Sequence, residues 1–410
     1  MQLTELTLTD YQSHAKQVTQ RSFMQTEEMA ELLRKRGMTT RFIGLVEEKT
    51  VLVSAILYSM PMTGGLHMEI NSGPVYQDDR YLRDFYRRLK DYAKQNGALE
   101  LIVKPYEIYQ TFDSNGQPTG EKQDYLIANL TQNGYLFDGL QTGYPGGEPD
   151  WHFVKDLNGL THENLVASFS KKGKSLMKKT HSFGMTVKRL QRDELSQFKA
   201  ITSVTSDRRE YLDKSLDYYQ DFYDSFGHKA EFTIASINFP AYLDRLNKSQ
   251  AKLTETLAQI EKDLEANPKS RKKQNEHREI SSQIDSFEQR KQEAGNWITQ
   301  YGHDDVPLAA SLFVYTDHEL VYLFSGSLTE FNNFYAPVLL QEYAMQQAIG
   351  RGISFYNLLG ITGNFDGSDG VLRFKQQFGG TILRRMGTFR YYPNPLKFKV
   401  LQLIKKLLGR

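Results

Sequence analysis

The sequence predicts an α+β protein of two similar halves, with a long helical hairpin inserted in the second half. Two observations support this fold class. Helical patterns, strand pairs and further helices follow one another in the same rough order before and after residue 155. Between residues 241 and 297, this mixed pattern gives way to apolar residues spaced three and four apart, the seam of a coiled coil.

The first half alternates helices and strands. Gly37 ends the first helical pattern, and Pro105 ends a buried strand. The expected elements are a helix over residues 27–37, an antiparallel strand pair over 41–46 and 50–61, a helix over 79–96 and a strand over 99–104.

The second half repeats the order of helices before strands. We expect helices over residues 163–182 and 192–211, then strands over 230–238, 308–315 and 319–325. The hairpin lies between the first two strands, so it must project from a domain whose chain leaves and returns at one place. The expected parts are a first domain (1–155), a second domain (156–240 and 298–393), the arm (241–297) and a C-terminal helix (394–410).

The arm is expected to be an antiparallel coiled coil. Asn267 and Pro268 interrupt the heptads, because proline lacks an amide donor and clashes with the preceding turn. Two helices joined by such a turn pack together to bury their apolar stripes. About 26 residues per helix make an arm of roughly 39 Å. The stripes are Leu243, Leu246, Gln250, Leu253, Leu257, Ile260 and Leu264, then Ile280, Ile284, Phe287, Ala294 and Ile298.

Composition excludes several classes of protein. The chain has 410 residues, a net charge of +2 and no cysteine, which excludes disulfides, thiol catalysis and thiolate metal sites. Its nine histidines lack the spacing of a metal site, so no metal is expected. We see neither a signal-peptide pattern nor an apolar run of about 18 residues, and therefore expect a cytoplasmic protein.

The C-terminal segment qualifies that expectation. Val400, Leu403, Ile404 and Leu407 share one helical face, and residues 397–410 contain five basic residues and no acidic one. A helix of this kind lies on an anionic membrane surface, which predicts peripheral contact with the inner face of the membrane. The alternative is a terminal helix docked on a domain with its lysines in water.

One glycine motif resembles a coenzyme A site. Residues 347–352 match Q-x-x-G-x-G, but phosphate binding requires the glycines at the start of a helix, where amides point outward. Here they follow an apolar helical pattern and indicate its C-terminal end. We therefore expect no coenzyme A and no other cofactor.

Candidate functional residues are cations next to aromatic residues or glycines. Lys375 follows Phe374 in a short helix or turn, where a lysine can hold a phosphate or stabilise an oxyanion. Lys35 and Arg36 end the first helix, where helix capping alone would explain them. The remaining candidates are Lys171, Lys172 and Lys174 for phosphates, and Lys214 with Tyr218 in a tyrosine-rich helix. Solvated helix faces or core packing are the alternatives.

Several segments in a fixed order carry a resemblance to a known family. They are Ser-Phe-Met-Gln-Thr at 22–26, Asn-Ser-Gly-Pro at 71–74, Lys-Pro-Tyr at 104–106, Ile-Asn-Phe at 237–239, Tyr-Asn at 356–357 with Gly360 and Gly363, and Phe374-Lys375. Together with the inserted hairpin they resemble the Fem family (FemABX) of peptidoglycan-branching aminoacyltransferases, most closely its MurM/MurN and FemA branches.

The resemblance implies two acetyltransferase-like (GNAT) domains with a coiled-coil arm. It implies transfer of an amino acid, alanine or serine, from aminoacyl-tRNA to the stem-peptide lysine branch of lipid II. By the same resemblance, Lys35 and Lys214 with Tyr218 bind the precursor's phosphates. Phe374 and Lys375 act at the aminoacyl-tRNA end. The arm would contact tRNA or a second copy in a homodimer.

The chain departs from the family pattern at two places. Lys214 stands where relatives have arginine, which puts bidentate phosphate binding in doubt. Lys104 stands where relatives often have aspartate, so no general base is assigned. Two other classes stay open: a coenzyme A-dependent N-acetyltransferase of the same fold, and a non-enzymatic scaffold that uses the arm.

Overall fold

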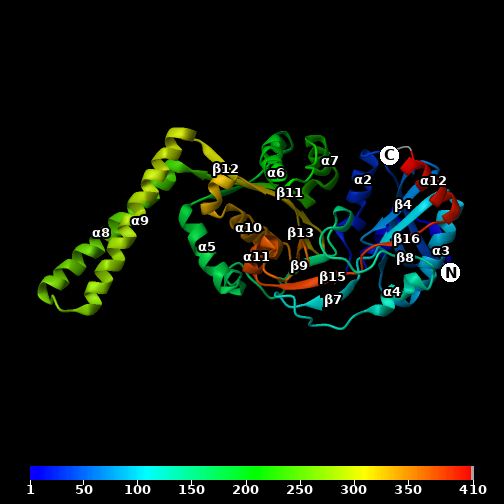
Figure 1. Ribbon diagram of the computed structural model, residues 1–410, viewed down its shortest axis with the longest axis horizontal. Helices are drawn as coiled ribbons and strands as arrows, with labels where there is room; N and C mark the ends of the chain where they lie inside the picture. The colour runs from blue at the N-terminus through cyan, green and yellow to red at the C-terminus, as the bar shows by residue number, and fades with distance from the viewer. Residues whose placement is uncertain (408–410) are drawn as a thin grey trace.

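The computed structural model describes residues 1–407 as two β-sheets side by side, covered by helices, with a helical arm projecting from one end (Figure 1). Residues 408–410, including the predicted basic Arg410, lie outside the described part. No helix within residues 1–407 is long and apolar enough to cross a membrane.

The first sheet has eight strands in the order β1-β2-β3-β4-β6-β16-β8, with β5 paired to β3. All neighbours are antiparallel except β4 and β6. Its strands are β1 (Gln2–Glu5), β2 (Thr39–Glu47), β3 (Thr50–Met62), β4 (Gly65–Asn71), β5 (Val75–Tyr76), β6 (Ala98–Lys104), β8 (Leu136–Phe137) and β16 (Phe389–Tyr391).

The second sheet also has eight strands, in the order β10-β11-β12-β13-β14-β9-β15-β7. Only β13 and β14 are parallel neighbours. Its strands are β7 (Ile108–Phe112), β9 (Trp151–Asp156), β10 (Thr186–Arg189), β11 (Ala230–Asn238), β12 (Asp305–Tyr315), β13 (Leu320–Ser327), β14 (Phe355–Ile361) and β15 (Thr381–Arg385).

Helices cover both faces of each sheet. The first sheet packs on α3 and α4 on one face and on α1 on the other, while the second packs on α5 and α10 on one face and on α6 and α7 on the other. The helices are α1 (Leu8–Ala15), α2 (Glu27–Lys35), α3 (Leu82–Gln95), α4 (Asp124–Thr131), α5 (Lys171–Phe183), α6 (Leu195–Arg209), α7 (Leu216–Phe226), α8 (Phe239–Ala266), α9 (Arg271–Tyr301), α10 (Ala336–Gly350), α11 (Gly370–Lys375) and α12 (Pro395–Leu407).

The two halves exchange segments. Strands β7 and β9 precede residue 157 yet lie in the second sheet, and β16 returns from the C-terminal part to the first sheet. Helix α2 contributes Met29, Leu32 and Leu33 to a core that otherwise belongs to α6, α7 and the second sheet. Segments from both sides of the expected boundary between residues 155 and 156 therefore contribute to each sheet.

The arm consists of α8 and α9, inserted between β11 and β12 as expected. Along it the seam positions are buried or half-buried, while most positions between them are exposed. At its base, Phe239 stacks on Trp297 and Tyr301 and contacts Phe331 of the second domain. This aromatic cluster anchors the arm to the sheet it interrupts.

Most predicted elements agree with the structure, and one differs in extent. The helix expected over 163–182 begins only at Lys171, because the Ser170 side chain accepts a hydrogen bond from the Gly173 amide and caps it there. The motif over 347–352 is the end of α10, as predicted, and Gly352 has a left-handed φ of +72°.

Helix α12 is present as predicted, but docking does not bury its apolar face. Leu396, Val400, Leu403, Ile404 and Leu407 are exposed. The helix is held by its other side, where Phe398 stacks on Tyr392 with ring centroids 4.0 Å apart and Leu401 packs against Gly64.

Candidate functional site

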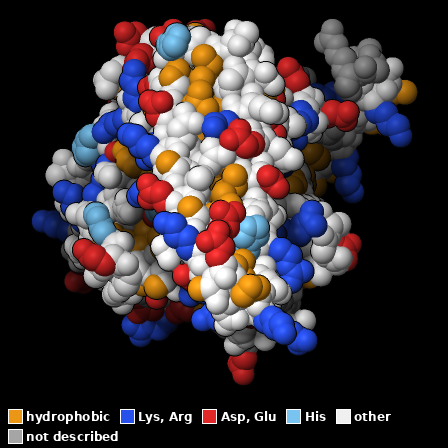
Figure 2. All heavy atoms as spheres, turned by 90° about the vertical axis from the view of Figure 1, so that its left-hand side faces the viewer, with side chains coloured by type: hydrophobic (Ala, Val, Ile, Leu, Met, Phe, Trp, Pro, Cys, Tyr) orange, Lys and Arg blue, Asp and Glu red, His pale blue; other side chains and the backbone are white. Residues whose placement is uncertain are grey.

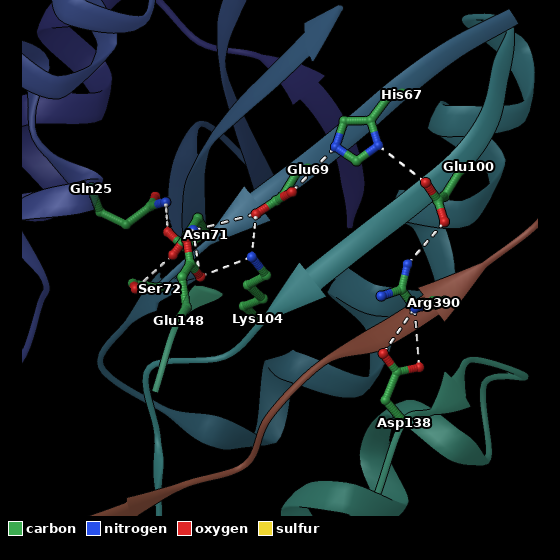
Figure 3. Close-up of polar contacts among 10 residues, drawn as sticks. All are labelled: Gln25, His67, Glu69, Asn71, Ser72, Glu100, Lys104, Asp138, Glu148 and Arg390. Atoms are coloured by element: carbon green, nitrogen blue, oxygen red, sulfur yellow. Dashed lines mark hydrogen bonds and ion pairs between the residues drawn. The ribbon is translucent and has the colours of Figure 1, made fainter. Parts of the chain in front are cut away.

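A chain of charged side chains runs along the parallel strands β4 and β6 (Figure 3). Alternate residues of a strand point to one face, so His67, Glu69 and Asn71 of β4 lie together. Glu100 and Lys104 of β6 lie beside them, since the register pairs His67 with Glu100 and Asn71 with Lys104. The local sequence thus places five polar groups on one face of the sheet.

His67 is held between two carboxylates. Its Nδ1 lies 3.1 Å from Glu100 Oε2 and its Nε2 lies 3.2 Å from Glu69 Oε2. Burial disfavours the imidazolium, but the hydrogen bonds and charges of Glu100 and Glu69 outweigh it and raise the pKa of His67 to about 9. His67 is therefore a cation at neutral pH.

Lys104 is likewise held between two carboxylates. Its Nζ lies 3.1 Å from Glu69 Oε1 and 2.8 Å from Glu148 Oε2. Asn71 Nδ2 also donates to Glu69 and, at 3.2 Å, to Glu148 Oε1. Burial opposes the charge of Lys104, but both carboxylates outweigh it and raise its pKa. Burial likewise favours neutral Glu69, yet its bonds to His67 and Lys104 lower the pKa of this carboxyl.

The far end of the charged chain reaches the last strand of the protein. Arg390 of β16 donates to Glu100 Oε1 at 3.0 Å and pairs with Asp138 Oδ2 at 2.9 Å. These charged side chains therefore tie strands distant in sequence into one network (Figure 3).

A cationic and aromatic cluster lies where α2 of the first half meets α7 of the second. Two cations contact the Tyr218 ring: the Arg36 guanidinium lies 5.1 Å from its centroid, and Lys214 Nζ lies 5.5 Å from it. Burial raises the pKa of Tyr218 to about 12, and the charge of Arg36 opposes the shift. Lys35 is exposed and instead pairs with Glu31 at 3.2 Å. Of the two neighbouring cations, Arg36 is the one at the junction.

Tyr58 connects this cluster to the charged chain. Its ring centroid lies 6.4 Å from that of His67. Burial and the negative charge of Glu69 raise its pKa, whereas the nearby Arg36 opposes the shift. The Arg36–Tyr218 cluster and the end of β4 therefore belong to one region between the two halves.

The second sheet borders the same region, because Leu359 of β14 packs in one cluster with Tyr58 and Tyr218. Strands β13 and β14 pair only at Leu320–Tyr356 and Val321–Asn357, and β14 then bends at Leu359, a non-glycine residue with φ +58°. Lys375 holds this bend, because its Nζ donates to the carbonyls of Leu359 at 3.0 Å and Gly360 at 2.6 Å.

Lys375 is buried, with 4% of its surface exposed, which excludes the alternative of a solvated helix lysine. Burial lowers its pKa to about 7, against the attraction of Asp369. Its ammonium faces the carbonyls of Leu359 and Gly360, so a direct contact with an oxyanion or phosphate stays a prediction. Phe374 beside it is half-buried and packs edge-to-face on Phe378.

The α5 lysines flank this segment. The Gly173 Cα lies so close to the Gln377 carbonyl that any side chain there would clash, which brings the start of α5 against the turn at residues 376–378 that follows α11. Lys171, Lys172 and Lys174 are exposed there. They form a cationic surface at the start of α5, which packs against residues 376–378.

The segment between β8 and β9 bridges the two sheets' parallel strands. Glu148 reaches Lys104 and Asn71 at the ends of β6 and β4. The next residue, Pro149, packs directly on Gly360 of the β14 bend, and Tyr144 lies beside it. Glu148 thus contacts the charged network of the first sheet, and the adjacent Pro149 contacts the bend of β14 in the second sheet.

The sequence analysis missed His67, Glu69, Glu100 and Glu148. A signal existed for three of them: polar residues at alternate positions of two strands that otherwise read as buried. Glu148 lies in a glycine-rich loop, where no pattern marks it. No group of residues within 1–407 is arranged to hold a metal ion.

A family profile decides the identity: the FemAB family matches residues 6–406. The chain belongs to the FemAB family. Its relatives include the aminoacyltransferase FemA of Staphylococcus epidermidis (strain RP62A), 26% identical over 99% of this chain and 100% of the relative. The FemA of Staphylococcus aureus (strain MRSA252) is also 26% identical and covers both chains fully. The predicted family is confirmed, and the protein is an aminoacyltransferase.

Solved structures support the fold. A crystal structure of FemX covers 99% of this chain and all of its own, with a TM-score of 0.73 at 21% identity. A tandem GNAT protein from the clavulanic acid pathway covers 96% of this chain and 99% of its own, with a TM-score of 0.50 at 9% identity. The α+β fold of two acetyltransferase-like domains with a helical arm is thereby confirmed.

Proposed function

We propose that this FemAB protein transfers alanine or serine from aminoacyl-tRNA to the lysine branch of the lipid II stem peptide. One observation supports this best: the charged chain of the first sheet and the bend held by Lys375 in the second meet through Glu148 and Pro149. An acceptor amine bound at the first and an ester bound at the second would lie together.

Juxtaposition is most of what this reaction needs. The ester is already activated, and holding it beside an amine is worth roughly 7–11 kcal/mol. A tetrahedral oxyanion forms during attack, and one lost donor to it costs about 10²–10³ in rate. Lys375 fixes the β14 backbone at this point, and Phe374 would pack on the terminal adenosine.

The cation cluster suits the precursor's pyrophosphate. Arg36 and Lys214 both contact the Tyr218 ring. Arg36 supplies the planar, bidentate donor that Lys214 lacks. Lys171, Lys172 and Lys174 would hold the tRNA backbone.

Helix α12 would place the enzyme on the membrane that holds lipid II. Its exposed leucines and Ile404 share the helix with Lys397, Lys399 and Lys406, which are exposed too. This composition fits an anionic lipid surface on the cytoplasmic side. Vesicle flotation with and without phosphatidylglycerol tests it, and equal recovery in both would contradict it.

The arm is proposed to contact tRNA or a second copy of the chain. Figure 2, which faces the arm, shows acidic, basic and hydrophobic side chains interspersed on this end of the molecule. At its tip, Lys273 is paired with Asp263 and Glu276. Deleting residues 243–298 and measuring both transfer and oligomeric state would separate these partners.

One assay tests the proposed reaction. Purified protein receives lipid II with a bare or a once-extended lysine, together with alanyl-, seryl- or glycyl-tRNA. Transfer of alanine or serine to one of the two acceptors is expected. Absence of transfer from every tRNA would contradict the proposal, and calorimetric binding of acetyl-coenzyme A would favour the acetyltransferase alternative.

A further inference from the structure

The amine that attacks the ester arrives protonated, and the first sheet holds an unbalanced charge beside the place of attack. Glu69, Glu100 and Glu148 carry three negative charges, whereas His67 and Lys104 carry two positive ones. Arg390 and Asp138 balance each other at the far end. Among these paired groups, the negative charges exceed the positive ones by one, which leaves room for a cation.

Glu148 is the carboxylate best placed to use that charge. Glu69 is buried and surrounded by His67, Lys104 and Asn71, so its oxygens are occupied. The Glu148 side chain is 52% exposed, so a ligand in solution can reach its oxygens although Lys104 and Asn71 donate to them. Through Pro149 it also adjoins Gly360, where the donor ester would lie.

We propose that Glu148 binds the ammonium group of the acceptor and removes the proton that must leave before attack. This inference rests on the proposed function and identifies a general base, which the sequence did not. Asn71 and Lys104 hold the Glu148 carboxylate in place and are positioning residues. The ligand class recognised here is a primary alkyl-ammonium, whether a lysine side chain or an amino acid already added to it.

The step balances as follows. The ammonium nitrogen gives one proton to a Glu148 oxygen, which passes it to water because the side chain is half exposed. The neutral nitrogen attacks the ester carbonyl carbon, forming the C–N bond. The bond from carbon to the ribose oxygen then breaks, and the second proton of the nitrogen moves to that oxygen.

The test compares Glu148→Gln with wild type, using two nucleophiles. Glutamine keeps the size of the side chain and an oxygen for Lys104. With lipid II at pH 7, the variant is expected to lose about 10²–10⁴ in kcat, the usual contribution of a general base. Its rate is expected to rise about tenfold per pH unit, because only the free amine then reacts. Hydroxylamine is uncharged at neutral pH, so its capture of the aminoacyl group, above the enzyme-free rate, is expected to stay within about twofold.

Glu163→Gln is the matched control, since Glu163 is exposed and lies outside the network. It is expected to match wild type with both nucleophiles. The inference is overturned if Glu148→Gln keeps a third or more of the lipid II rate. It is also overturned if hydroxylamine capture falls equally, because the role is then structural. Failure of the wild type with every aminoacyl-tRNA would instead refute the proposed function.

Discussion

The first sheet keeps its parallel strands together to their last residues, whereas the second sheet lets its parallel strands separate. β4 and β6 pair over six residue positions up to Asn71 and Lys104, and charged side chains close their end. β13 and β14 pair at two positions, and Lys375 holds the bent strand from inside. Similar domains thus end their parallel strands differently, with charged side chains in the first sheet and a bend held by Lys375 in the second.

The largest expected effect comes from the second sheet, where β13 and β14 separate. Lys375→Met removes the ammonium that bridges the Leu359 and Gly360 carbonyls. We expect transfer to fall by at least about 10²–10³, because the bend is lost where the oxyanion forms. The fold is expected to persist, since methionine suits the buried position. Circular dichroism and single-turnover transfer check both points, and near-normal turnover would contradict the role.

The free energy of unfolding is expected to depend on pH through His67, which lies in the charged network of the first sheet. Its folded pKa of about 9 exceeds the ordinary 6.5, so its stabilising effect is complete below pH 6.5 and is lost as pH rises toward 9. The loss is on the order of 3 kcal/mol. Denaturant unfolding between pH 6 and 9 measures it. His67→Gln should flatten this dependence, and an unchanged slope would show that the network is not charged as described.

The cluster of Arg36, Tyr218 and Lys214 is expected to govern binding of the acceptor, lipid II. Arg36→Ala should raise the KM for lipid II about tenfold with little change in kcat, because a charge-assisted phosphate contact is lost in ground and transition states alike. Lys35→Ala is the matched control and should stay near wild type, since Lys35 pairs with Glu31 instead. Equal effects of the two substitutions would contradict the assignment.

The smallest effect is expected from the α5 lysines. Replacing Lys171, Lys172 and Lys174 together with alanine should weaken tRNA binding only a few-fold at physiological salt, because exposed phosphate contacts are screened. The dependence of binding on salt should become shallower. Filter binding at two salt concentrations measures both, and an unchanged salt slope would place the tRNA elsewhere.

The sequence predicted the fold class and the arm well because both depend on local periodicity. Strand β11 matches its expected bounds, and the Asn267–Pro268 turn separates α8 from α9. The exchange of β7, β9 and β16 between sheets could not be predicted, since strand pairing is set by contacts far apart in the chain.

The site was predicted only in part. Phe374 and Lys375 were proposed because an aromatic next to a cation is visible in sequence, and Tyr218 because it follows Lys214 in a tyrosine-rich helix. The state of Lys375 was not, because burial depends on how α11 packs against β14. Glu148 meets Lys104 across 44 residues of chain, and no periodic pattern reports a contact of that kind.

The return of β16 to the first sheet has a consequence for synthesis. Phe389, Arg390 and Tyr391 pair with β6 and β8, so the amino-terminal sheet is incomplete until almost the whole polypeptide has left the ribosome. The two domains therefore mature together rather than one after the other, as separate modules would. A gene truncated before codon 389 would leave β6 with an open edge that is prone to aggregation, even though β4 and its charged residues are all present.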